Sequence, residues 1–176
     1  ATPTFATKVD LTTGIKPKSV SIGDINGDGL PDLAVANAGS NSASILLNTT
    51  ATGATTTTFA TKVDFTTGTG PRAVSIGDIN GDGKPDLAVA NAGSGTASIL
   101  LNTTATGATT PTFATNVDFT TGTNPRSISI GDFNGDLKPD LAVVNYSDGT
   151  ASILLNTTAT NAATPTFATK VDLTTG

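Results

Sequence analysis

The stretch Gly23-Asp24-Ile25-Asn26-Gly27-Asp28-Gly29-Leu30-Pro31-Asp32 defines the unit from which this chain is built. Counted from Asp24, oxygen-bearing side chains occupy positions 1, 3, 5 and 9, and a glycine occupies position 6. Carboxylate and amide oxygens at this spacing, on a loop that can turn sharply at glycine, are ligands that proteins wrap around Ca2+. The stretch therefore predicts a calcium-binding loop.

The same stretch occurs twice more, each time 54 residues further along the chain. The copy at 77–86 keeps the glycine at position 6, whereas the copy at 131–140 has Leu137 there. The period extends beyond the loop, and a fixed period is typical of architectures in which each unit packs on its neighbours. The chain divides into repeat 1 (15–68), repeat 2 (69–122) and repeat 3 (123–176), and residues 1–14 are an extra copy of 163–176.

Within each repeat, apolar and polar residues alternate with the period of a β-strand, and no segment has a helical pattern. In repeat 1 the alternation predicts strands over 19–22, 33–37, 44–48 and 59–65, with the Asp loop between the first two. The third strand is the most apolar and is expected to be buried on both faces. The fold class is therefore all-β, with one four-stranded antiparallel unit in each 54-residue repeat.

Two further expectations concern the end of the repeat. In the fourth strand, Lys62 and Asp64 are expected to point away from the face that carries Phe59 and Phe65. The Thr/Ala/Gly connection 49–57 is expected to be ordered and exposed, because its length is constant; the alternative is disorder, since such a segment has little apolar surface to bury.

Composition excludes several classes of function. The 176 residues contain no Cys and no His, so no zinc site with sulfur or nitrogen ligands can form, and neither residue is available as a catalytic nucleophile or base. No Ser–Lys pair or carboxylate pair stands apart from the Asp loops. The nine Lys and Arg residues are scattered and form no basic patch for nucleic acid. No apolar run reaches the length of a membrane span. We therefore expect neither an enzyme, nor a nucleic-acid partner, nor a membrane span.

The distribution of acidic residues favours a bound cation. All fourteen acidic residues are Asp, and nine of them lie in the three loops. Without a cation, each pair of carboxylates about 5 Å apart would repel by roughly 1–3 kcal/mol. Three divalent ions would more than offset the formal net charge of −5. A metal-free polar turn is the alternative, because Asn, Asp and Gly are ordinary turn residues; the fourth ligand and the constant spacing count against it.

We predict one Ca2+ per repeat, three in total, each held by the side chains at positions 1, 3, 5 and 9 and the backbone carbonyl at position 7. Position 12 is valine where an EF-hand has a bidentate Glu, so the loop is not an EF-hand. The predicted ligands are Asp24, Asn26, Asp28, Leu30 and Asp32; Asp78, Asn80, Asp82, Lys84 and Asp86; and Asp132, Asn134, Asp136, Lys138 and Asp140.

The third site is predicted to be the weakest. Position 6 commonly requires a positive φ, which costs a residue such as Leu137 on the order of 1 kcal/mol.

Three asparagines, Asn48, Asn102 and Asn156, each begin an Asn-Thr-Thr triplet that fits the N-glycosylation acceptor pattern. They are candidate glycosylation sites. The alternative is that each is a turn residue at the end of a strand.

Each repeat resembles the FG-GAP/VCBS repeat, which occurs in integrin α-subunit propellers and in many secreted bacterial proteins. The matching residues in repeat 1 are Pro17, the run Val20-Ser21-Ile22-Gly23-Asp24-Ile25-Asn26-Gly27-Asp28-Gly29, then Asp32-Leu33-Ala34-Val35-Ala36-Asn37 and Ser44-Ile45-Leu46-Leu47. The resemblance implies a β-propeller-like blade with calcium between its first two strands. It also implies an extracellular location, secreted or at the cell surface, and a structural or adhesive role.

The number of blades leaves the assembly open. Propellers usually need four to eight blades, so three blades cannot close a ring alone. The outermost repeats are unmodified copies, where finite arrays usually carry polar caps. We expect a segment of a long array or filament, in which the chain joins adjacent repeats or copies of itself head to tail. The alternative is a module of a closed β-propeller that binds glycans or cell-surface proteins.

Overall fold

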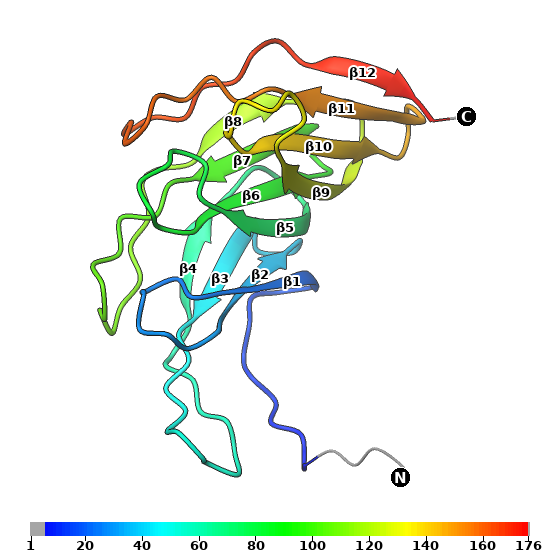
Figure 1. The fold of residues 1–176 in the computed structure, drawn as a ribbon. Coiled ribbons are helices and arrows are strands. Elements are labelled where there is room, and N and C mark those ends of the chain that lie inside the picture. Colours follow the sequence, from blue (N-terminus) through cyan, green and yellow to red (C-terminus); the bar gives the residue numbers. More distant parts are fainter. Residues whose placement is uncertain (1–5, 176) are drawn as a thin grey trace, which may run out of the picture.

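The computed structural model describes residues 6–175, which fold into twelve β-strands arranged as three four-stranded antiparallel sheets, one per repeat (Figure 1). In every sheet the strand order in space follows the order in sequence. The all-β prediction with one sheet per repeat is confirmed. Residues 6–175 contain no helix, and therefore no helix that could cross a membrane.

The three sheets have equivalent strands. Repeat 1 contains β1 (Pro17–Gly23), β2 (Asp32–Asn37), β3 (Ser42–Leu46) and β4 (Val63–Thr66); repeat 2 contains β5 (Pro71–Gly77), β6 (Asp86–Asn91), β7 (Thr96–Leu100) and β8 (Val117–Thr120); repeat 3 contains β9 (Pro125–Gly131), β10 (Asp140–Asn145), β11 (Thr150–Leu154) and β12 (Val171–Thr174).

The third and fourth strands differ from their predicted bounds. β3 ends at Leu46 instead of residue 48, and β4 begins at Val63 instead of residue 59. The register of the two strands, which pairs Ile45 with Val63, shifts by one residue before Asn48 pairs with Phe59, and this shift interrupts the regular ladder. Only an isolated bridge between Asn48 and Phe59 extends it.

The core lies between successive sheets. One cluster joins Ile25 and Ile45 of repeat 1 to Val74 and Leu87 of repeat 2, and an equivalent cluster joins repeats 2 and 3. Every residue of β3 and all but the first of β7 are buried, which confirms the prediction for repeats 1 and 2, whereas β11 at the outer repeat is only partly buried. Apolar burial of this kind is the main stabilising term in folding. Each repeat therefore depends on its neighbour for much of its core.

The first strands of the repeats, β1, β5 and β9, lie next to one another, with the later strands of each sheet fanning outward (Figure 1). Gly23, the last residue of β1, lies against Ile76 of β5, and a Cβ on Gly23 would lie 3.0 Å from the Ile76 side chain. Gly77 and Ile130 repeat this contact at the next junction. Glycine at this position therefore allows neighbouring sheets to approach closely.

The connection between the third and fourth strands is ordered in all three repeats. In repeat 1, Thr49 N–H donates to the carbonyl of Thr58 at 2.9 Å, and Thr58 N–H donates to the hydroxyl of Thr50 at 2.9 Å. Residues 51–58 are exposed, as predicted. Most of the connection is also exposed in repeats 2 and 3, but there it packs on the preceding repeat and buries Thr104, Pro111, Thr158 and Pro165, which the prediction missed.

Candidate metal centre

Each Asp loop joins the first strand of a sheet to the second and is closed by its own carboxylates. At position 1, Asp24 accepts the N–H of Asp28 at 3.0 Å and that of Gly29 at 2.9 Å. Asp78 accepts the equivalent two N–H groups in repeat 2. The position-1 carboxylate therefore holds the middle of the loop.

Positions 3, 5 and 7 are joined by a second set of hydrogen bonds. Asp28 accepts the N–H of Leu30 at 2.8 Å, so the position-7 peptide lies beside the position-5 carboxylate. Lys84 and Lys138 donate to Asp82 and Asp136 in the same way, both at 2.9 Å.

The position-3 asparagines face both the loop and the next repeat. Asn26 donates its amide to Asp28 at 2.9 Å and to the carbonyl of Ala108 at 3.0 Å. In repeat 2, Asn80 donates to Ala162 at 3.1 Å.

At position 9, Asp32, Asp86 and Asp140 are completely buried. Asp32 accepts the N–H of Ile25 at 2.8 Å through one oxygen and that of Asn48 at 2.7 Å through the other. Asp86 and Asp140 accept the equivalent pairs of N–H groups. Each position-9 carboxylate thus joins the start of the loop to the end of the third strand.

Burial affects these carboxylates directly. It raises the pKa of Asp86 to about 6, against the opposing effect of the N–H groups of Asn102, Ile79 and Asn80. Burial also raises the pKa of Asp32. In the exposed third loop, the N–H of Leu137 is the main cause of a lowered pKa at Asp132. Asp32 and Asp86 are therefore costly to ionise without a nearby positive charge.

The backbone at position 6 has the conformation that the sequence predicts. Gly29 and Gly83 have φ of 85° and 84°, and Leu137, which occupies the same position in repeat 3, has φ of 66°. The Leu137 side chain is 91% exposed, so its packing contributes little to offset the strained backbone. This confirms the predicted conformation at Leu137.

Replacing this leucine should stabilise the protein. We expect Leu137→Gly to raise the free energy of unfolding by about 1 kcal/mol, because glycine adopts a positive φ without the steric cost of a Cβ. Urea denaturation of both proteins measures the difference. Gly83→Leu, the reverse change at the equivalent position, should lower stability by a similar amount, and a Leu137→Gly protein that is less stable than the parent would contradict the strain.

The loop carboxylates have no basic partners. The ion pairs found within residues 6–175 are Lys8–Asp10, Lys62–Asp64 and Lys170–Asp172, and all three lie outside the loops. The Lys62–Asp64 pair agrees with the predicted outward direction of these two side chains. In the part of the chain described, the nine loop carboxylates are thus balanced only by neutral donors, namely backbone N–H groups and the amides of Asn26 and Asn134.

The donor chemistry of the loops fits Ca2+. All side-chain ligands predicted for the three sites are carboxylate or amide oxygens, which suit a hard cation. In residues 6–175 no three acidic side chains already converge into a ligating cluster; their oxygens are turned toward the N–H groups of the loop. A carboxylate oxygen that accepts one N–H keeps a second lone pair, so these hydrogen bonds are compatible with ligation.

The three candidate glycosylation asparagines are buried in the structure. Asn102 and Asn156 are each 2% exposed, and Asn48 is 8% exposed. The Asn102 amide donates to the carbonyl of Ile25 at 2.9 Å and to that of Pro85 at 3.0 Å. Both amide hydrogens of Asn102 are thus used within the folded chain. Asn102 joins repeat 2 to the loop of repeat 1, and Asn156 makes the same two bonds one repeat later.

A row of polar side chains crosses each sheet, a feature that strand patterning alone misses. In repeat 1, Asn37 donates to Ser44 at 2.8 Å, and Ser44 donates to Asp64 at 2.5 Å. The same chain of hydrogen bonds occurs in the other two repeats. Its constant spacing in the sequence is the one pattern that points to it. Asp64 and its equivalents are therefore structural groups.

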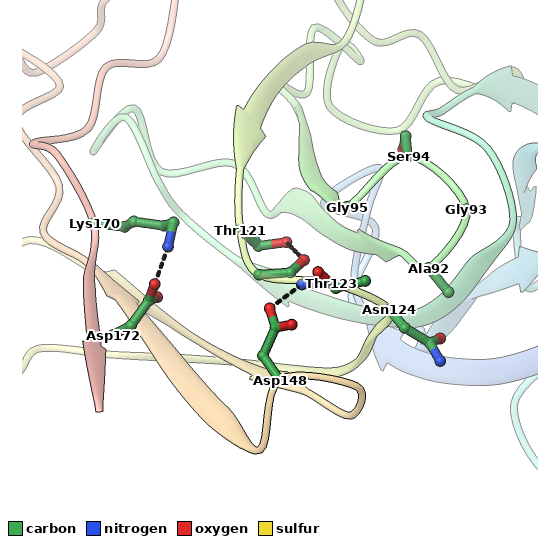
Figure 2. A pocket seen from close by; sticks show the side chains of 11 residues that line it. Ala92, Gly93, Ser94, Gly95, Thr121, Thr123, Asn124, Asp148, Lys170 and Asp172 are labelled. Atoms are coloured by element: carbon green, nitrogen blue, oxygen red, sulfur yellow. Dashed lines mark hydrogen bonds and ion pairs between the residues drawn. The ribbon is translucent and has the colours of Figure 1, made fainter. Parts of the chain in front are cut away.

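A shallow hollow of about 400 Å³ lies between the turns of repeats 2 and 3 (Figure 2). Its charged groups already have partners, since Lys170 pairs with Asp172 and Asp148 accepts the N–H of Thr123 at 2.5 Å. The lysine of the hollow is therefore already paired, and the Asp148 carboxylate is already hydrogen-bonded.

Comparison with known proteins supports the interpretation of the repeats. The FG-GAP-like repeat family matches residues 24–89 and again residues 80–143. Each match begins in one Asp loop and ends in the second strand of the following repeat. A comparison with curated proteins found no match. Because the two family matches together span more than half of the sequence, the chain belongs to the FG-GAP-like repeat family.

Proposed function

We propose that the chain is a calcium-stabilised repeat module with a structural or adhesive role outside the cell, acting as a segment of a longer array. The observation that carries this proposal is the concentration of nine carboxylates in three equivalent loops, three of them fully buried and none paired with a basic side chain within residues 6–175.

A bound Ca2+ would neutralise the loop carboxylates. The side chains at positions 1, 3, 5 and 9 and the carbonyl at position 7 would hold the ion. The protein itself supplies the rigid frame, because position 9 is fixed to the loop and to the third strand by buried hydrogen bonds. Neutralisation at this point would strengthen the link between the first two strands of every sheet.

The extracellular location and the structural role rest on the family and on composition. The resemblance to the repeats of integrin α-subunit propellers implies an adhesive role, and neither Cys nor His is available as a nucleophile or base. The module is thus proposed to act through its surfaces and not through chemistry.

Calorimetric titration tests the calcium sites. We expect three Ca2+ ions per chain, with the site of repeat 3 the weakest because of Leu137 and because its loop is the most exposed. Asp28→Ala should reduce the stoichiometry to two. Asp10→Ala, which removes a carboxylate outside the loops, is the matched control and should leave it at three. Absence of calcium binding would overturn the proposal.

A further inference from the structure

The outward faces of repeats 1 and 3 expose residues that the internal junctions bury. Phe133 of repeat 3 is 55% exposed, whereas Ile25 and Ile79, which hold the same position in repeats 1 and 2, are 2% exposed. On the opposite side, Val20 of repeat 1 is 58% exposed and its equivalent Val74 is 6% exposed. Each outward face therefore carries one half of a junction.

The two internal junctions use the same hydrogen bonds. At the first junction, Asn102 donates to the carbonyl of Ile25, Asn26 donates to the carbonyl of Ala108, and Gly107 N–H donates to the carbonyl of Asn26 at 2.7 Å. At the second junction the same three bonds form from Asn156 to Ile79, from Asn80 to Ala162 and from Asn161 to Asn80. The junction is thus a defined set of contacts that recurs unchanged.

The outward faces of repeats 3 and 1 carry the groups that could form the same three hydrogen bonds at a third junction. The face of repeat 3 presents the carbonyl of Phe133 and the side chain of Asn134, and the face of repeat 1 presents Asn48, Gly53 and Ala54 at the matching positions. Gly53 has the same positive φ as Gly107 and Asn161, so the connection of repeat 1 already has the junction conformation. We propose that repeat 1 of a second copy of this chain docks on repeat 3 of the first through these contacts.

Residues 6–14, which precede repeat 1, lie in a position that suits the docking of repeat 1 on the repeat 3 of another copy. Gly14 N–H donates to Asn37 at 3.1 Å, just as Gly122 N–H donates to Asn145 at 3.0 Å where the chain passes from repeat 2 to repeat 3. Residues 6–12 have no strand partner, and four residues separate residue 12 from β1, as between β4 and β5. The segment therefore leaves repeat 1 along the path that the fourth strand of a preceding repeat takes.

Docking in the internal geometry would bring residues 9–12 of the second copy to the place of β12. The two segments have the same sequence, Val-Asp-Leu-Thr, so either can pair with β11 in the same register. All four residues of β12 are exposed in the chain described. In the docked pair, residues 9–12 of the second copy therefore replace β12 of the first copy and pair with β11 of the first copy. This is strand addition to a sheet edge.

This inference rests on the proposed role as a segment of an array, and it names the partner and the surface. Two single variants test it, studied in excess calcium by analytical ultracentrifugation. Ile22→Lys blocks the face of repeat 1, and Phe133→Lys blocks the face of repeat 3, because docking would bury an unpaired charge. Each variant alone should remain monomeric, while the parent chain assembles. An equimolar mixture should form one-to-one dimers that grow no further.

The controls separate docking from folding. Both substituted residues are exposed, so the circular dichroism spectra of the variants should match that of the parent. Asn116→Lys adds the same charge away from both faces and should assemble like the parent. A monomeric parent chain, or a mixture that stays monomeric, would overturn the proposal. Three bound calcium ions on a chain that stays monomeric would leave the calcium part of the proposed function standing.

Cross-linking tests the strand exchange. The chain has no native Cys, so introduced thiols are unique. Thr150 pairs with Thr174 in the sheet, and Thr12 is the equivalent of Thr174 in the exchanged segment. Thr150→Cys with Thr12→Cys should form disulfides between chains. Thr150→Cys with Thr174→Cys should form them within one chain, and only in molecules whose β12 has not been exchanged. Dimers in the mixing experiment without interchain disulfides would overturn the exchange.

Discussion

Removing calcium with EGTA is expected to lower the melting temperature by roughly 15–30 °C. A ligand present at a hundred times its dissociation constant stabilises the folded state by about 2.7 kcal/mol per site, and three sites together by about 8 kcal/mol. For a protein of this size, each kcal/mol corresponds to about 2–4 °C. The physical reason is that the folded chain would otherwise hold nine carboxylates in three loops without positive partners.

Differential scanning calorimetry with and without EGTA measures this effect. Adding calcium back in excess should restore the original transition, and magnesium at the same concentration should restore less of it, because the smaller ion demands a tighter octahedral geometry. A melting temperature that is the same with and without EGTA would show that the loops need no metal.

Asp86→Ala is expected to lower the free energy of unfolding by about 3–5 kcal/mol even in EGTA. Asp86 is fully buried and accepts the N–H groups of Ile79 at 2.8 Å and Asn102 at 2.7 Å. Alanine would leave both donors buried without a partner, and each such donor costs about 1–3 kcal/mol. Working in EGTA removes any contribution of metal binding, so the measurement isolates the hydrogen bonds.

Asp82→Ala is the matched control for this variant. Asp82 lies in the same loop, is only half-buried and accepts the N–H of Lys84 at 2.9 Å. Without calcium its removal should cost less than about 1 kcal/mol, because water can satisfy the donor. Equal losses for the two variants in urea denaturation would contradict a special structural role for position 9.

The sequence predicts the parts of this fold that depend on local chemistry. The 54-residue period fixes the number of sheets, alternation fixes the central strands, and the glycines at 29 and 83 predict the positive φ that the structure shows at Leu137. Each of these features depends on residues close together in the chain, so a pattern of a few residues is enough.

Contacts between repeats could not be predicted in this way. The amide of Asn26 meets the carbonyl of Ala108, 82 residues away, through a connection of Thr, Ala and Gly that has no apolar pattern. Asn102 fits an acceptor pattern for sugar, yet it is buried at a junction. Both residues recur in every repeat, but recurrence alone does not distinguish a junction residue from a turn residue.

Every strand pairing in residues 6–175 joins strands that are consecutive in the chain. A sheet can therefore form through short loop closures, which favours fast folding for an all-β protein. Cooperativity between sheets comes only from nearest neighbours, as in a one-dimensional chain of coupled units. Duplication of one 54-residue gene segment thus adds a sheet without disturbing any strand pairing already made, and each added sheet turns an outward face into an internal one.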